Sequence, residues 1–335
     1  MQRHSQLLVC FVFLVARLAF SGEDKQKVYE AARQRAMEVS DIFGVGPLQI
    51  LATFHLHTMG GGIDGTYRYR QLSKGQYLEE IQSPSFNESI VYSAGQRYLV
   101  RSRQFEPLPI SYLRELFQFA IPADAPVSKV STTVQMGRNL KCYVVERGQG
   151  ITEFSGFEAC FDAETAVLAS RETSFNTEVH RAEYSKFLSD GDRLFPTEMR
   201  MLRNGNPVVE VSVDSISHPP TDAKLLDPPP NASKEDVCKR FQPAEPVYSD
   251  DYFRIRSSHL SGSVIIMGSV DDRGKVRETE IQQPADPKVN QDALKAIREV
   301  RTHPAKCDGH AIASFFRLQI WFSPALHPDL FQSFR

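Results

Sequence analysis

Hydrophobic and polar residues alternate along most of the first two thirds of the chain. Residues 48–57 show the clearest alternation, which predicts a strand with one apolar face. A turn is predicted over 60–65, followed by strands at 66–72, 76–81, 89–92, 97–102, 127–134, 140–146, 158–162, 167–173, 178–187, 194–203 and 208–216. Asn204-Gly205, between the last two strands, is a strong hairpin signal. Successive hairpins of this kind predict an antiparallel, strongly curved sheet or half-barrel.

Two segments of this region have helical periodicity instead. Residues 24–43 carry an apolar stripe at helical spacing, formed by Val28, Ala32, Ala36, Val39 and Phe43. Pro107 and Pro109 interrupt the strand pattern, and a short helix is predicted after them at 110–120. The predicted order is a helix, strands, a helix inserted at mid-chain, and more strands.

The C-terminal quarter has a different order of elements. Residues 262–271 and 275–283 predict two strands, joined by a tight turn at Asp272-Arg273-Gly274 in which glycine supplies the positive φ. A helix is predicted over 290–301, with an apolar face formed by Val289, Ala293, Ile297 and Val300. A closing strand is predicted over 310–322. The fold class predicted for the whole chain is therefore α+β, with a curved antiparallel sheet and a small β-β-α-β domain.

Three short motifs in this quarter carry a family resemblance. G-x-V begins at Gly262, D-x-x-G-K-V spans the turn from Asp271, and P-A-x-C-D-G begins at Pro304. In this order they resemble the C-terminal domain of TonB-family energy transducers, over about residues 248–322. The resemblance implies a docking module without chemistry of its own.

The closing strand contains the residues expected to bind a partner. Its alternation places Ile312, Phe316, Leu318, Ile320 and Phe322 on the face toward the helix, and Phe315, Arg317, Gln319 and Trp321 on the other. In the TonB family this strand lies near the edge that accepts an extended receptor peptide, so the resemblance implies β-augmentation by a protein or peptide. A homodimer or interdomain contact is the alternative use of these side chains.

The larger domain resembles another family. The phrase from Cys160 to Glu172 is similar to the F-D-x-x-T-G-x-L-L-x-R-E turn of LolA-type lipoprotein carriers, and Phe195-Pro-Thr-Glu198 is similar to their F-P-x-x-I step. Those proteins use an unclosed β-barrel lidded by helices, with an apolar hollow for acyl chains. The resemblance implies a LolA-like fold and, as one hypothesis, a lipid ligand; fold alone does not fix function.

Domain organisation follows from length and composition. The 335 residues suggest two domains. Residues 1–21 are predicted to be a signal peptide, 22–218 the LolA-like domain, 219–247 a Pro-rich linker, and 248–335 the TonB-like domain. Export to the periplasm is expected, and inner-membrane anchoring stays open if the signal is not cleaved. A net charge of −2 gives no basic field for nucleic acid.

Export favours disulfides among the cysteines that remain after Cys10 is removed. We expect Cys142–Cys160, which lie on strands joined by a hairpin, and Cys238–Cys307, which would clamp the segment entering the C-terminal domain. Four free buried thiols are the alternative. A zinc site is less favoured because there is no C-x-x-C pair.

Candidate chemistry is sparse. His55-x-His57 puts two imidazoles on one strand face, a spacing that can chelate a metal, but with no third ligand nearby in sequence we expect an ordinary strand face. No nucleophile elbow, zinc-protease, Walker or Rossmann motif occurs, so neither an enzyme nor a cofactor is predicted.

Three functional hypotheses remain. The first is an exported adaptor whose TonB-like domain docks an extended peptide or an outer-membrane TonB-dependent receptor. The second is a periplasmic carrier of lipid or another apolar ligand. The third is a signal-anchored TonB-type energy transducer.

Overall fold

The computed structural model describes residues 23–43, 46–58, 61–119, 121–123, 126–135, 137–145, 154–175, 178–220, 223–235, 237–247, 262–299 and 301–322. The predicted signal peptide and Cys10 lie outside these residues. The chain divides into two compact units: a first unit of residues 1–93 and 109–228, and a second unit of residues 94–108 and 229–335. A short segment from the first half of the chain thus belongs to the C-terminal unit, an arrangement that no sequence pattern indicated.

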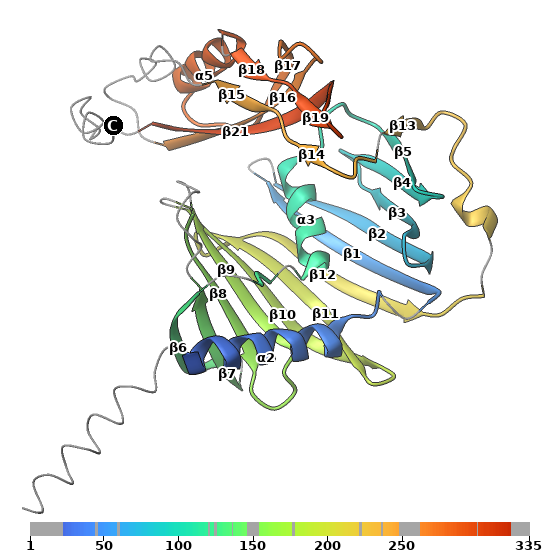
Figure 1. The fold of residues 1–335 in the computed structure, drawn as a ribbon, viewed down its shortest axis with the longest axis vertical. Helices are drawn as coiled ribbons and strands as arrows, with labels where there is room; N and C mark the ends of the chain where they lie inside the picture. The colour runs from blue at the N-terminus through green and yellow to red at the C-terminus, as the bar shows by residue number, and fades with distance from the viewer. Residues whose placement is uncertain are drawn as a thin grey trace, which may run out of the picture. The chain divides into compact units, whose positions relative to one another are not determined.

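The first unit consists of one large antiparallel sheet and two helices (Figure 1). Its elements are α2 (Glu23–Ser40), β1 (Leu48–Thr58), β2 (Gly61–Ser73), β3 (Gln76–Gln82), β4 (Asn87–Ser93), α3 (Leu108–Gln118), β6 (Val127–Gln135), β7 (Arg138–Val145), β8 (Phe154–Asp162), β9 (Leu168–Phe175), β10 (Glu178–Asp190), β11 (Arg193–Arg203), β12 (Asn206–Ser217) and the 3₁₀ turn η1 (Ala223–Leu226). The strand order is β4-β3-β2-β1-β12-β11-β10-β9-β8-β7-β6. This confirms the predicted curved antiparallel sheet with few helices.

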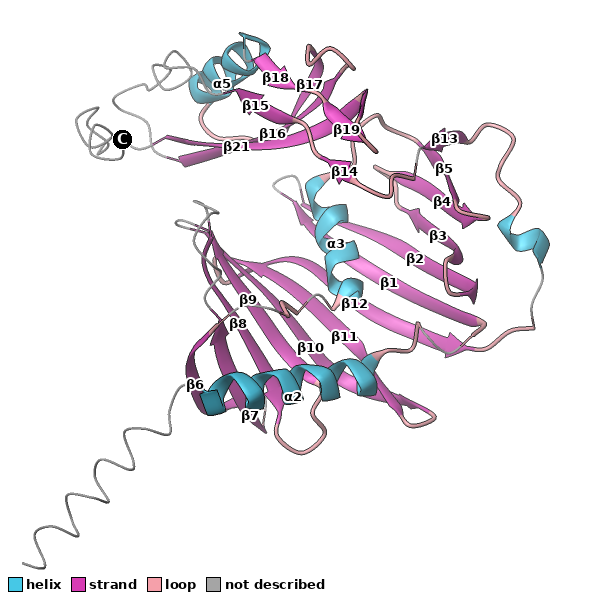
Figure 2. Cartoon of the chain, viewed as in Figure 1, coloured by secondary structure: helices cyan, strands magenta, loops and turns pink. Residues whose placement is uncertain are grey.

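The helices α2 and α3 cover one face of the sheet (Figure 2), and aromatic side chains of these helices pack against aromatic side chains of the strands. Tyr67 of β2 stacks on Phe117 of α3 at 4.2 Å between ring centroids, and Tyr29 of α2 lies 5.5 Å from Tyr143 of β7. Tyr29 also donates a hydrogen bond from its hydroxyl to the carbonyl of Pro122 at 2.7 Å. Buried tyrosines combine a large apolar surface with a hydroxyl that needs a partner, so these contacts fix the helices on the sheet.

The turn predicted over 60–65 is wrong, because β2 already begins at Gly61. The glycines serve close packing instead. A Cβ on Gly62 would overlap the imidazole of His55, and one on Gly65 would overlap the ring of Phe54. Glycine inside a strand often marks such a close approach, which the local sequence does not distinguish from a turn.

The second unit contains several small sheets and one helix. Its elements are β5 (Gln96–Arg101), β13 (Ser233–Glu235), β14 (Phe241–Gln242), β15 (Glu245–Val247), β16 (Gly262–Val270), β17 (Val276–Gln283), α5 (Pro287–Glu299), β18 (Arg301–His303), β19 (Ala305–Cys307), β20 (His310–Ile312) and β21 (Ser314–Phe322). The largest of these sheets has the order β17-β16-β21. Its core joins sheet and helix through buried residues that include Val264, Ile266, Val289, Ala293, Ile297, Phe316 and Leu318.

The predicted hairpin turn between β16 and β17 is confirmed. One carboxylate oxygen of Asp271 accepts hydrogen bonds from the backbone N–H groups of Arg273 and Lys275 at 3.0 and 2.9 Å. Gly274 has φ +79°, and a Cβ there would collide with the carbonyl of Thr302. Only glycine satisfies both conditions, so the D-x-x-G spacing follows from the geometry of the turn.

The boundaries of the C-terminal helix differ from the prediction. α5 begins at Pro287, because Asp286 caps it by accepting the N–H of Lys288 at 2.9 Å. It ends at Glu299, and the predicted last residue, Arg301, starts β18, which pairs with β15. Within the segment predicted as a Pro-rich linker, residues 245–247 therefore form a strand. Pairing with a distant segment is not visible in local periodicity.

Both expected disulfides are present. Cys142 and Cys160 are directly paired across β7 and β8, and Cys238 is bonded to Cys307 of β19. Among the residues that the structure describes, no helix is long and apolar enough to cross a membrane.

Candidate functional site

A small apolar pocket lies in the first unit between α2, the end of α3 and the start of β9. Its volume is about 120 Å³, and its apolar lining includes Ala36, Phe43, Phe117, Phe119, Ile121 and Leu168. Met37 and Asp41 are exposed at its rim, whereas Ala36 and Leu168 are buried. The pocket is smaller than the roughly 300 Å³ at which typical ligand sites begin. A pocket of this size holds only a short apolar group. A whole lipid tail can enter only if the surrounding aromatic rings move.

Phe119 is the residue of this pocket with an unusual backbone. It follows α3 directly and has φ +43°, in the left-handed region. That conformation costs a side chain with a Cβ roughly 1–2 kcal/mol. Its ring lies 5.1 Å from Tyr184 and 5.6 Å from Phe195 between centroids. Packing against these two rings offsets the backbone cost, and strained residues of this kind are concentrated at functional sites.

The predicted partner-binding residues lie on β21. This strand pairs with β16 alone among the described residues, so it is an edge of its three-stranded sheet. Phe316 and Leu318 are buried toward α5, while Phe315 is 46% exposed and Arg317 is exposed, as the alternation predicted. The backbone of Trp321 pairs with Ser263, and its side chain lies outside the described residues. An unpaired backbone edge of nine residues is therefore present where the sequence placed the docking strand.

Part of this face is contacted by the chain itself. The buried ring of Phe105 lies 5.6 Å from the ring of Phe315, edge to face. Arg103 donates to Glu280 of β17 at 2.6 Å. Gln319 has a buried side-chain nitrogen without a hydrogen-bond partner among the described residues. Sequence reasoning missed the contribution of 103–105, because nothing local links that segment to a strand more than 200 residues later.

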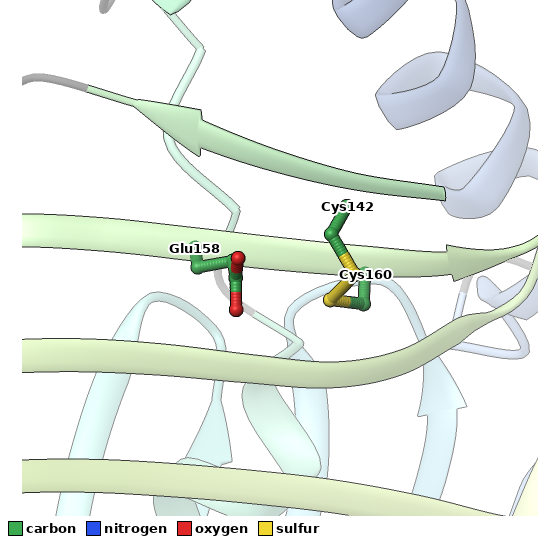
Figure 3. Close-up of side chains that lie close together, drawn as sticks. All are labelled: Cys142, Glu158 and Cys160. Atoms are coloured by element: carbon green, nitrogen blue, oxygen red, sulfur yellow. A yellow bond between two sulfur atoms is a disulfide. The ribbon is translucent and has the colours of Figure 1, made fainter. Parts of the chain in front are cut away.

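The predicted disulfide residues form one further cluster of potential ligand atoms. Figure 3 shows Cys142 and Cys160 joined by their sulfur–sulfur bond, with Glu158 on the same strand as Cys160. The ligand atoms of the three lie within 4.8 Å of one another. Because the two sulfurs are bonded to each other, neither is a thiolate, and the cluster holds β7 to β8 rather than a metal.

No family model matches the chain, and no curated protein matches it. Several solved structures are similar. A DUF1329 family protein from Desulfovibrio piger has 11% identity, with 61% of this chain and 97% of that chain covered and a TM-score of 0.44. A LolA superfamily protein from Nitrosomonas europaea has 11% identity, with 59% and 96% covered and a TM-score of 0.38. The Pseudomonas aeruginosa MucA/MucB complex has 11% identity, with 73% and 81% covered and a TM-score of 0.31. The functions proposed below accordingly depend on the geometry of this chain.

Proposed function

We propose that the protein is an exported binding protein of the cell envelope, and that its first unit takes up an apolar chain of a lipid or similar amphiphile. The observation that carries this proposal is the apolar pocket between α2, α3 and β9. Burying apolar surface there contributes about 25 cal/mol per Å², and no catalytic group is needed. The signal peptide expected at residues 1–21 supports an envelope location.

Entry of a longer chain requires the pocket to widen. Phe119 is the side chain best placed to move. Its backbone is strained, so leaving the left-handed region lowers the free energy of that backbone and favours the movement. Its displacement would uncover Tyr184 and Phe195, which extend the apolar wall toward β10 and β11. A ligand thus replaces the aromatic contacts that close the pocket in its absence.

Filling the pocket should weaken ligand binding. Ala36→Leu places extra carbon atoms in the space, and we expect at least a fivefold loss of affinity for the fluorescent fatty acid cis-parinaric acid, because overpacking a filled site costs about 1–3 kcal/mol. Leu168→Ala enlarges the same space and should preserve or strengthen binding. Fluorescence titration of the full chain measures both, with circular dichroism as the check on folding.

Val134→Ala is the matched control, because Val134 is an exposed apolar residue on β6 that does not line the pocket. It should bind like the wild type. Equal affinity of Ala36→Leu and wild type, with both folded, would reject the pocket as the ligand site.

A second candidate function is docking of an extended peptide on the edge of β21. The specific observation is that the outer edge of this strand has no pairing partner within the described part of the chain, and β-augmentation requires such an edge. The TonB-like interpretation of residues 248–322 belongs to this candidate, with an outer-membrane transporter as partner and an energy transducer as its anchored form. Both candidates involve binding alone, and the two sites lie in different units.

Peptides selected from a random library on the full-length protein test this candidate. We expect Phe315→Ala to weaken their binding at least tenfold, because Phe315 is an exposed aromatic residue of β21. Phe241→Ala removes another exposed ring of the same unit, on β14, and should have no effect. Fluorescence polarisation gives both affinities; equal losses in the two variants would argue against docking at β21.

A further inference from the structure

The helix-free face of the large sheet carries a groove with several charged residues in its lining, and the proposed function does not use it. The groove has a volume of about 890 Å³ and crosses β1, β2, β10, β11 and β12. Four acidic residues line it, namely Asp64, Glu183, Glu198 and Glu210, against one basic residue, Arg200. This imbalance favours cations over anions in the groove.

Strand register gathers two histidines and two carboxylates at one point of this face. On β1, His55 is directly opposite Asp64 of β2 on one side and Glu210 of β12 on the other. His57 lies two residues further along β1, so its side chain projects from the same face. Directly opposed residues have Cβ atoms about 4.5–5.5 Å apart, within reach of one another's polar groups.

Each imidazole is oriented by one of these carboxylates. Nδ1 of His55 lies 2.7 Å from Oδ1 of Asp64, and Nε2 of His57 lies 2.8 Å from Oε2 of Glu210. A carboxylate accepts the N–H, so the second ring nitrogen of each histidine carries a lone pair. Among the described residues, Nε2 of His55 and Nδ1 of His57 have no hydrogen-bond partner.

The two rings lie close together, and the strand beside them leaves room for this arrangement. Their centroids are 4.7 Å apart. The imidazole of His55 occupies the place that a Cβ on Gly62 would take. Imidazoles whose far nitrogen donates to a carboxylate are the usual form of histidine ligands, since the carboxylate fixes the tautomer and raises the basicity of the ligating nitrogen.

We propose that His55 and His57 bind one divalent transition-metal ion, such as Zn²⁺ or Cu²⁺, on the helix-free face of the sheet. Nε2 of His55 and Nδ1 of His57 are the protein ligands, and Asp64 and Glu210 are positioning residues. Nitrogen ligands favour Zn²⁺ and Cu²⁺ over Mg²⁺ and Ca²⁺, which prefer oxygen. The sequence favoured an ordinary strand face because the two carboxylates, which lie on β2 and β12, come into range only through strand pairing.

Titration calorimetry of the untagged full-length protein, freed of metal with EDTA, tests this site with Zn²⁺ and separately with Cu²⁺. We expect saturable binding of one ion, weakened at least tenfold by His55→Ala or His57→Ala. Asp64→Asn and Glu210→Gln should weaken it about tenfold to a hundredfold while leaving both ligands in place. Gly62→Ala should weaken it as well, by pushing the ring of His55 aside.

His218→Ala is the matched control. His218 is also exposed and its Nε2 lies 2.8 Å from a carboxylate, that of Asp190, but its Nδ1 is already bonded to the carbonyl oxygen of Pro47 at 2.7 Å. This variant should bind metal like the wild type. The electron paramagnetic resonance spectrum of Cu²⁺ bound to the wild type should show nitrogen ligation, and His55→Ala should lose it. No saturable binding of either ion, or an equal loss in His218→Ala, would overturn the proposal.

Discussion

Replacing Arg114 by alanine is expected to lower the free energy of unfolding of the first unit by about 3–5 kcal/mol, because it leaves buried carboxylates without a counter-charge. Nε of Arg114, on α3, donates to Glu79 of β3 at 3.0 Å, and its terminal nitrogen is paired with Glu88 of β4. The side chain of Glu88 is 0% exposed. Burial alone would lower the pKa of Arg114, but the two glutamates raise it above its ordinary value. The guanidinium therefore stays charged and holds α3 against the sheet.

Denaturant unfolding followed by far-ultraviolet circular dichroism measures this loss. The chain has one tryptophan, Trp321, in the second unit, so its fluorescence reports that unit separately. Arg68→Ala is the control: Arg68 pairs with Glu80 at 3.1 Å but is 46% exposed, and exposed pairs contribute about 0–1 kcal/mol. Arg114→Met combined with Glu79→Gln and Glu88→Gln should recover part of the loss. Equal effects of Arg114→Ala and Arg68→Ala would contradict the expectation.

Local periodicity predicted the elements of both units well. The alternation of β1 places Ile50, Ala52, Phe54 and Leu56 in the core, as expected. Val289, Ala293 and Ile297 of α5 are likewise buried. These predictions need only the neighbours of each residue along the chain, because a buried face imposes its period on the sequence.

The failures share a physical cause: each depends on a residue in another element, which the period within one segment does not show. Gly61 to Gly65 form a strand because rings of β1 need the space. Arg301 leaves the helix because β15 pairs with it. Phe105 joins the second unit because it packs near Phe315.

The candidate sites follow the same division. His55 and His57 were recognisable as a pair from their spacing, whereas Asp64 and Glu210 were added by register. Phe315 and Arg317 were placed on the correct face of β21 by alternation alone. The lining of the apolar pocket could not be predicted from the sequence, because its walls come from three separate elements, α2, α3 and β9. Its small volume results from aromatic rings that come into contact only in the folded unit.

Removing the Cys238–Cys307 disulfide is expected to destabilise the second unit by about 4 kcal/mol, since a longer closed loop restricts the unfolded chain more strongly. This bond joins residues 69 positions apart, whereas Cys142 and Cys160 are 18 apart, for which the same relation gives about 3 kcal/mol. The arm from Cys238 contributes β14 and β15, which pair with β19 and β18. Without the bond, these two- and three-residue strands must hold the arm unaided.

The double variant Cys238→Ala, Cys307→Ala should therefore unfold at lower denaturant concentration when followed by Trp321 fluorescence. The transition seen by far-ultraviolet circular dichroism, to which the larger first unit contributes most, should change little. Dithiothreitol should reproduce this effect in the wild type before it reaches the other bond, because Cys238 and Cys307 are partly exposed while Cys142 and Cys160 are buried. Cys142→Ala with Cys160→Ala is the matched control, and it should shift the circular dichroism transition instead. A Trp321 transition that does not move in the first double variant would mean that β14 and β15 are held by their pairing alone, so that the loop argument does not apply to this unit.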